Sequence, residues 1–189
     1  MTRRATAKLK RTTRSAAVKR AALRRKVLRG TPRNTAKVND LYAMLKKDHE
    51  KVKQMFNAII SGKATRDTFE ELARELRNHM QLEEEYLYPV LEEHEISKDI
   101  AMHADEEHLA AKNLILEIEN LEYDNERWIP KLEVLRGSVE HHIEHEEGEI
   151  FKKMKKVLSR EVTQEIVEQI MDEKTRMHQE NPELLRAAI

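Results

Sequence analysis

The chain has no cysteine and little glycine, proline or aromatic residue. Its 189 residues include four Gly and four Pro, and aromatic side chains make up 4%. Without cysteine there are no disulfides, thiolate zinc sites, iron–sulfur clusters or cysteine nucleophiles, so any metal must be held by His and carboxylate ligands. Charged residues reach 37%. This composition argues against a β-sandwich or barrel and favours helices with solvated outer faces.

Long apolar runs are also missing. No run approaches the roughly 18 apolar residues that a membrane span needs, so we expect no membrane span. We see no secretory signal and therefore expect a cytoplasmic protein of bacterial type. Organellar import through the basic N-terminus is the alternative.

Acidic residues are absent from residues 1–39, which contain 14 Lys or Arg, although the whole chain has 35 basic and 35 acidic residues. We assign residues 1–37 to a basic arm, disordered or partly helical. Three interpretations are open for it: a solvated tail, an organellar transit peptide, or a segment that binds nucleic-acid phosphates without sequence specificity. The last makes non-specific nucleic acid a candidate partner.

From Asp40 onward, apolar residues recur with helical periodicity. We predict an all-α fold: an up-down-up-down four-helix bundle over residues 38–158, and an amphipathic helix with a tail over 159–189. The bundle helices are expected at about 40–61, 66–88, 97–121 and 130–158, because short connections favour antiparallel neighbours. Asn39 or Asp40 should cap the first helix and Gly62 should end it. Gly137 and Gly148, inside the fourth helix, suggest close packing there.

Two similar segments, NHMQLEEEYLYP and HHIEHEEGEIFK, each carry His-x-x-x-Glu on a predicted apolar stripe. Residues four apart share one helix face, so each pair can bind one metal centre. The other two helices each carry one His at mid-length. Counted from the turns, all of these side chains reach a similar depth in the bundle. The candidate ligands are His49, His79, Glu83, His108, His142 and Glu146.

A cation explains this pattern better than six separate core residues do. Buried unpaired carboxylates cost several kcal/mol each, and no Lys or Arg lies nearby on these stripes. His145 is an alternate ligand or supports the site, and His103 cannot easily share a site with His108. His141 is expected on the outer face. His94 and His178 are expected to be exposed.

Together with LKKDHEKVKQMF and EEHLAAKNLILEI, these segments resemble the hemerythrin-like (HHE cation-binding) domain over residues 38–158. The resemblance implies a four-helix bundle around a non-haem di-iron centre. His49, His79, His108 and His142 would be terminal ligands, and Glu83 and Glu146 would bridge the irons. Respiratory hemerythrins have a second His four residues from the third-helix ligand, where this chain has Ala104 and Lys112. The chain thus departs from the oxygen carriers.

We therefore expect two non-haem Fe ions with an oxo or hydroxo bridge, and Mn or Zn are the alternatives. About two coordination positions would stay open for O2, NO or peroxide. The predicted function is a di-iron protein that binds or senses O2, NO or iron. The alternatives are a nucleic-acid-associated protein acting through residues 1–37 and a di-iron peroxidase or NO-detoxifying enzyme. No separate acid–base or nucleophile group is visible, which favours binding or sensing over catalysis.

Overall fold

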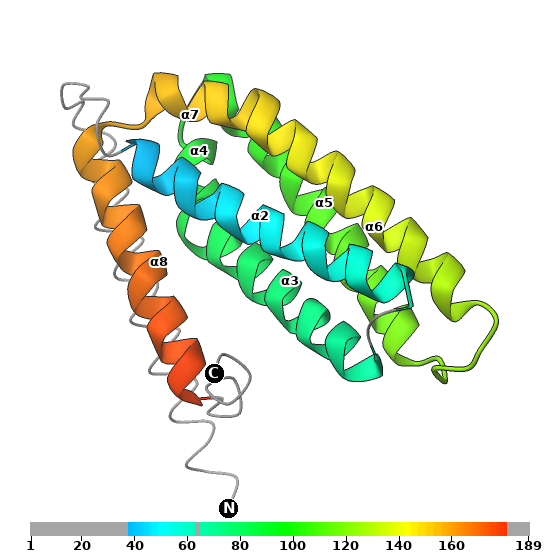
Figure 1. The fold of residues 1–189 in the computed structure, drawn as a ribbon. Helices are drawn as coiled ribbons and strands as arrows, with labels where there is room; N and C mark the ends of the chain where they lie inside the picture. Colours follow the sequence, from blue (N-terminus) through cyan, green and yellow to red (C-terminus); the bar gives the residue numbers. More distant parts are fainter. Residues whose placement is uncertain (1–37, 63–64, 181–189) are drawn as a thin grey trace, which may run out of the picture.

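The structure, a computed structural model, describes residues 38–62 and 65–180, and these residues form helices and no strand. The elements are α2 (Val38–Ile60), α3 (Arg66–Tyr86), α4 (Tyr88–Glu92), α5 (Glu95–Glu119), α6 (Trp128–His145), the π-helical η1 (Glu146–Ile150), α7 (Phe151–Val157) and α8 (Arg160–Glu180). Helices α2, α3, α5 and α6 lie side by side, and α8 packs against α2 and α3 (Figure 1). The predicted all-α bundle with an extra C-terminal helix is confirmed. The up-down-up-down order and the domain boundaries at 37 and 158 stay predictions.

Several predictions concern residues outside the described ranges. The basic arm over residues 1–37, its suggested helix and its suggested contact with nucleic acid all lie there, as does the tail beyond residue 180. Among the described residues, no helix combines the length and the apolar character that crossing a membrane requires.

The helix ends follow local signals in the sequence. Gly62 has φ +71° and its N–H donates to the carbonyl of Ile59, so the predicted end of the first helix is confirmed. Its beginning was predicted too late, because α2 starts at Val38 and includes Asn39 and Asp40. Pro89 follows the break between α3 and α4, where its missing N–H costs no helical hydrogen bond.

The predicted fourth helix continues through α6, η1 and α7 with a change of hydrogen-bonding pattern at Glu146. Single π turns are frequent at functional sites, and this one begins at the predicted ligand Glu146. The predicted close packing at Gly137 and Gly148 is wrong, because a Cβ added to either meets no atom within 4 Å. Gly148 lies within the π-helical turn η1.

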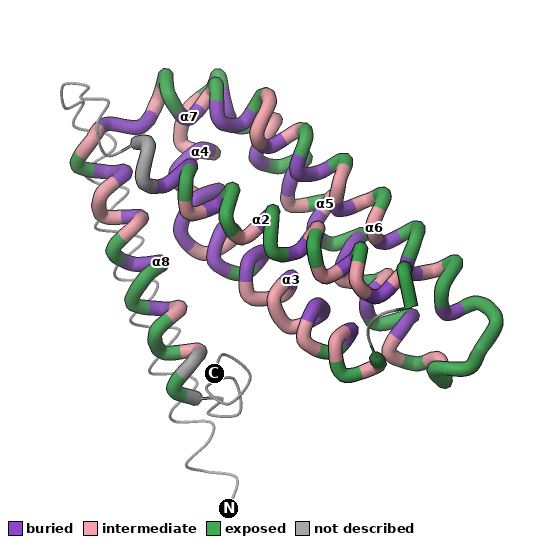
Figure 2. The backbone as a smooth tube through the Cα atoms, in the orientation of Figure 1, coloured by how far each residue is buried: buried purple, intermediate pink, exposed green. Residues whose placement is uncertain are grey.

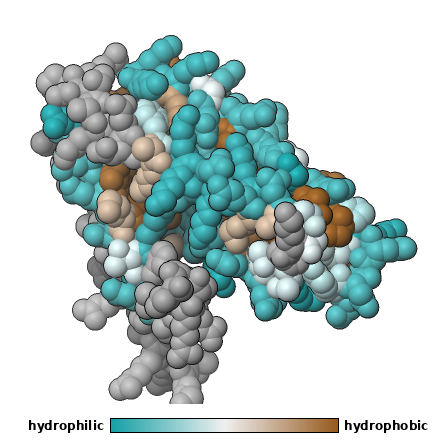
Figure 3. Space-filling view, in the orientation of Figure 1, coloured by the Kyte–Doolittle hydropathy of each residue, from teal (hydrophilic) through white to brown (hydrophobic). Residues whose placement is uncertain are grey.

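Two apolar clusters fill the bundle, one on each side of a layer of polar side chains. One cluster includes Phe56, Leu72 and Leu132, and the other includes Leu45, Leu87 and Ile150. Buried positions recur along the inward side of each helix (Figure 2). The outer face seen in Figure 3 is covered mostly by hydrophilic side chains, as the charged composition indicated. The polar layer is therefore enclosed by apolar packing along the bundle.

Truncation of a buried leucine should destabilise the bundle more than truncation of an exposed one. Leu132 in α6 is 0% exposed, whereas Leu109 in α5 is 51% exposed. Leu132→Ala should lower the free energy of unfolding by about 2–5 kcal/mol, because it removes apolar contacts and leaves a cavity. Leu109→Ala is the matched control and should change it by less than about 0.5 kcal/mol. Urea unfolding of the metal-free proteins, followed by circular dichroism, checks this. Similar losses in the two variants would contradict the assignment.

Candidate metal centre

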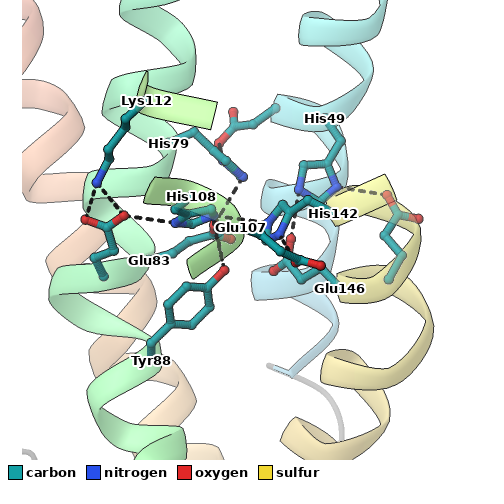
Figure 4. A network of polar contacts seen from close by, with 12 residues as sticks. His49, His79, Glu83, Tyr88, Glu107, His108, Lys112, His142 and Glu146 are labelled. Atoms are coloured by element: carbon teal, nitrogen blue, oxygen red, sulfur yellow. Dashed lines mark hydrogen bonds and ion pairs between the residues drawn. The ribbon is translucent and has the colours of Figure 1, made fainter. Parts of the chain in front are cut away.

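All six predicted ligand residues meet in the polar layer, and all six are buried. They come from α2 (His49), α3 (His79 and Glu83), α5 (His108), α6 (His142) and η1 (Glu146). Figure 4 shows these side chains pointing toward one another from their helices. Glu83 and Glu146 are 0% exposed, a placement that is unfavourable for a carboxylate without a cation or a full set of hydrogen bonds.

The six side chains form two groups that share one member. Ligand atoms of the first group lie within 4.8 Å of one another, and so do those of the second; the groups are His49, His79, Glu83 and Glu146, and Glu83, His108 and His142. Glu83 Oε2 is 3.4 Å from the Nε2 atoms of both His79 and His108. Oε2 of Glu83 therefore lies between an imidazole of the first group and one of the second. Glu146 belongs to the first group and lies 3.0 Å from Nε2 of His49.

Each of the four imidazoles turns Nδ1 toward a carboxylate behind it. Nδ1 of His49 donates to Glu147 at 2.9 Å, that of His108 to Glu84 at 3.0 Å and that of His142 to Glu107 at 2.8 Å. Nδ1 of His79 faces Asp48 at 3.6 Å, too far for a hydrogen bond. Because a carboxylate only accepts, Nδ1 carries the hydrogen in the three bonded rings. A neutral ring then directs the lone pair of Nε2 into the centre, as metal-bound histidines do.

Lysines stabilise three of these outer carboxylates. Lys46 pairs with Glu147, Lys112 with Glu84 and Lys174 with Asp48. Lys112 lies four residues after His108, at one of the two positions where respiratory hemerythrins would have a second His ligand. It reaches the site through Glu84 and does not enter it.

Two features of the inner atoms show that the residues fit a cation. Nε2 of His108 and Nε2 of His142 are 3.1 Å apart, and two rings that each carry a single hydrogen on Nδ1 have none to place between these atoms. In addition, some buried atoms have no hydrogen-bond partner among the described residues: Nε2 of His49 and His79, Oε1 of Glu83 and both carboxylate oxygens of Glu146. His49 Nε2 and Glu146 Oε2 are close, but their geometry is not that of a hydrogen bond. A cation would satisfy these atoms together.

The same packing shifts the pKa values of the inner groups. Burial, together with the nearby Glu146 carboxylate, raises the pKa of Glu83 well above its usual value. Burial lowers the pKa of His79 to about 4. Burial opposes protonation of His49 too, but the Glu146 carboxylate outweighs it and raises the pKa of His49 to about 9. Without a cation, near neutral pH, His49 thus keeps its second proton, and burial favours the protonated form of Glu83.

Tyr88 in α4 follows the first His-x-x-x-Glu motif and was given no role in the predicted site. Its buried hydroxyl donates to Glu83 Oε2 at 3.3 Å and lies 3.3 Å from Nε2 of His108 (Figure 4). Burial and the Glu83 carboxylate raise the pKa of Tyr88, so the hydroxyl keeps its hydrogen. No sequence signal distinguished this tyrosine from Phe151, its counterpart in the second motif.

Sequence reasoning also missed the outer carboxylates, although a signal for them exists. Asp48, Glu84, Glu107 and Glu147 each lie next to a predicted ligand in the sequence. In each case the carboxylate supports the imidazole of a different helix: Asp48, beside His49, faces His79, and Glu147, beside Glu146, faces His49. The pattern to look for is thus an acidic residue adjacent to one ligand on each helical segment of the bundle, beside His49, Glu83, His108 and Glu146.

The remaining histidines lie outside the inner groups. His145 is half-buried and faces Glu107 at 3.4 Å, and His103 lies against the same carboxylate. His141 is exposed, as predicted. The predicted exposure of His94 is wrong, because its side chain is half-buried at the start of α5. The side chain of His178 lies outside what the structure describes.

Comparison with known proteins agrees with this geometry. The family model described as the hemerythrin HHE cation binding domain matches residues 40–154, more than half of the chain. No curated protein and no solved structure matches the chain. The matched range includes all six inner residues and their four outer carboxylates, and the family implies metal-ion binding, typically of iron. The chain belongs to the hemerythrin HHE cation-binding domain family.

Proposed function

We propose that the protein binds two iron ions in this centre and uses them to bind or sense O2 or NO. The observation that carries the proposal is the convergence of Nε2 and carboxylate lone pairs in two groups that share Glu83. His49, His79 and Glu146 would hold one ion, and His108 and His142 would hold the other. Glu83 would contact both. Bound iron would supply open coordination positions and a reversible change of oxidation state.

The protein's own residues prepare the centre for that role. The outer carboxylates hold three of the rings with Nδ1 protonated, so each of these rings turns Nε2 toward the centre. His49 must also give up its second proton before its Nε2 can bind a metal. The Tyr88 hydroxyl donates to Oε2 of Glu83 and orients this carboxylate between His79 and His108. Apolar clusters on both sides keep bulk water away. Because the ligands are already oriented and water is excluded, this ligand set favours binding of two ions and slows their loss to solvent.

A small cavity beside the four imidazoles supports a diatomic ligand. Its volume is about 20 Å³, and apolar side chains, among them Val52, Leu76, Ala111 and Val139, line much of it. A cavity of this size holds roughly one water-sized molecule, and its apolar wall gives water few partners. O2 and NO match both the volume and the polarity. A larger substrate does not, which favours binding or sensing over turnover of an organic substrate.

Metal uptake tests the ligand set. Anaerobic Fe(II) reconstitution should give two irons per full-length chain, and air should then produce the visible absorption of ferric iron. His79→Ala combined with His142→Ala removes one imidazole from each group and should abolish stoichiometric uptake. His94→Ala, outside both groups, should retain it. Iron analysis and optical spectra check this. Unchanged uptake in the double variant, or none in the wild type, would refute the proposal.

Metal binding should also release protons. At pH 7 the metal must displace a proton from His49, whose pKa is raised to about 9, and the raised pKa of Glu83 adds to the proton release. The apparent affinity should therefore increase with pH between about pH 6 and 8, by about tenfold per pH unit for each proton displaced. Anaerobic calorimetry of Fe(II) binding in two buffers of different ionisation enthalpy counts the protons. His49→Ala should release fewer, and a pH-independent affinity would contradict the prediction.

Filling the cavity tests the diatomic ligand. Ala111 is buried and lines the cavity, whereas its neighbour Ala110 is exposed. Ala111→Leu should slow NO binding by the ferrous protein at least about tenfold, because the added atoms occupy the ligand's space. Ala110→Leu adds the same atoms to the surface and should leave the rate unchanged. Stopped-flow absorption measures the rates, and iron analysis should show two irons in both variants. Equal rates would exclude this cavity as the ligand's position.

A further inference from the structure

A second cluster of imidazole and carboxylate groups lies on the outer side of α5 and α6. We call it the outer cluster; its members are His103, Glu107, His141 and His145. His103 and Glu107 are four residues apart on α5, and His141 and His145 are four residues apart on α6. This spacing places each pair on one helix face. The two pairs meet across the contact between the helices.

The distances within the outer cluster suit a metal ion. Oε1 of Glu107 is 3.4 Å from Nδ1 of His103 and 3.6 Å from Nε2 of His141, and Oε2 is 3.4 Å from Nδ1 of His145. Ligands in a tetrahedral zinc site, with bonds of about 2.0–2.1 Å, are about 3.4 Å apart. Ligand atoms of His103, Glu107 and His145 all lie within 4.8 Å of one another. Little movement would bring these three around one cation, and rotation of the exposed His141 side chain would bring in the fourth ligand.

The partners of Glu107 set it apart from the other outer carboxylates. Asp48, Glu84 and Glu147 each pair with a lysine, whereas every ion pair of Glu107 among the described residues is with a histidine. Its Oε1 atom is buried and has no hydrogen-bond partner among those residues. Glu107 thus has three outer imidazoles around it, whereas each of the other outer carboxylates has a lysine.

We propose that the outer cluster is a second metal site, separate from the inner centre, which binds a divalent transition metal such as Zn²⁺ through His103, His141, His145 and Glu107. Imidazole and carboxylate are the ligands that Zn²⁺ takes where no thiolate is present. The side chains of His103 and His141 are 63% and 73% exposed, so the metal reaches the site directly from solvent. The site does not require the inner centre to hold iron.

The outer site touches the inner centre through one carboxylate. Oε2 of Glu107 accepts a hydrogen bond from Nδ1 of His142 at 2.8 Å and faces His145 at 3.4 Å. A cation held by Glu107 would withdraw electron density from the oxygen that orients His142. Occupation of the outer site therefore alters the ligand strength of one inner imidazole.

Zn²⁺ titration of the metal-free full-length protein, with a chromophoric chelator as competitor, tests the proposal. The wild type should bind one more Zn²⁺ per chain than the variant His103→Ala with His141→Ala, since both keep the inner residues. These two positions are exposed, so the variant should fold. His94→Ala removes an imidazole elsewhere and should bind as the wild type does. Equal Zn²⁺ numbers and affinities in wild type and double variant, or the same loss in His94→Ala, would overturn the proposal.

A variant of the inner centre separates the two proposals. His49→Ala with His79→Ala should lose iron uptake, yet the difference of one Zn²⁺ should persist when His103→Ala and His141→Ala are added to it. If the wild type binds no iron and this difference remains, the inner-centre proposal fails and the outer site stands. If the difference disappears in the inner-site variant, the outer cluster is not a separate site.

Discussion

The bundle depends on a set of lone pairs that face one another in a buried layer. Two imidazole nitrogens 3.1 Å apart, and carboxylates that are 0% exposed with unpartnered oxygens, would destabilise an ordinary core. The apolar clusters on both sides make this cost larger, because they exclude the water that would otherwise solvate the groups. A cation between these groups would replace the repulsion among their lone pairs with attraction to the metal. Metal binding and folding stability are therefore coupled in this domain, because part of the free energy of metal binding offsets the cost of burying the ligands.

The rings are oriented by residues of other helices, and this couples the helices to the site. Glu84 of α3 holds His108 of α5, Glu107 of α5 holds His142 of α6, and Glu147 of η1 holds His49 of α2. A rotation of one helix would thus disturb a ligand on its neighbour as well as its own. Because each carboxylate is adjacent in sequence to a ligand, the same rotation also moves that ligand. This arrangement fixes the register of the four helices more tightly than apolar packing alone.

The sequence predicted the helices and the meeting of the six inner residues, since both follow from the helical period. Leu45, His49 and Val52 share one face because of their spacing alone. It did not predict the π turn at Glu146, because apolar periodicity says little about a local change in backbone hydrogen bonding. Nor did it predict the Tyr88 hydroxyl, whose direction depends on the break between α3 and α4. The outer carboxylates were missed because charged residues beside the apolar stripes were read as solvated.

Helix α8 lies beyond the range that the family model matches, yet it contributes to the centre's support. Lys174 of α8 pairs with Asp48, the carboxylate that faces His79. Without α8 this carboxylate would lose its lysine partner, and His79, whose pKa burial lowers to about 4, would carry no charge near neutral pH to replace it. At 3.6 Å the contact between Asp48 and His79 is also the longest of the four, and a cavity of about 210 Å³ lies beside it. His79 is consequently the ring least constrained by its surroundings, and the packing of α8 on α2 and α3 bears directly on its position.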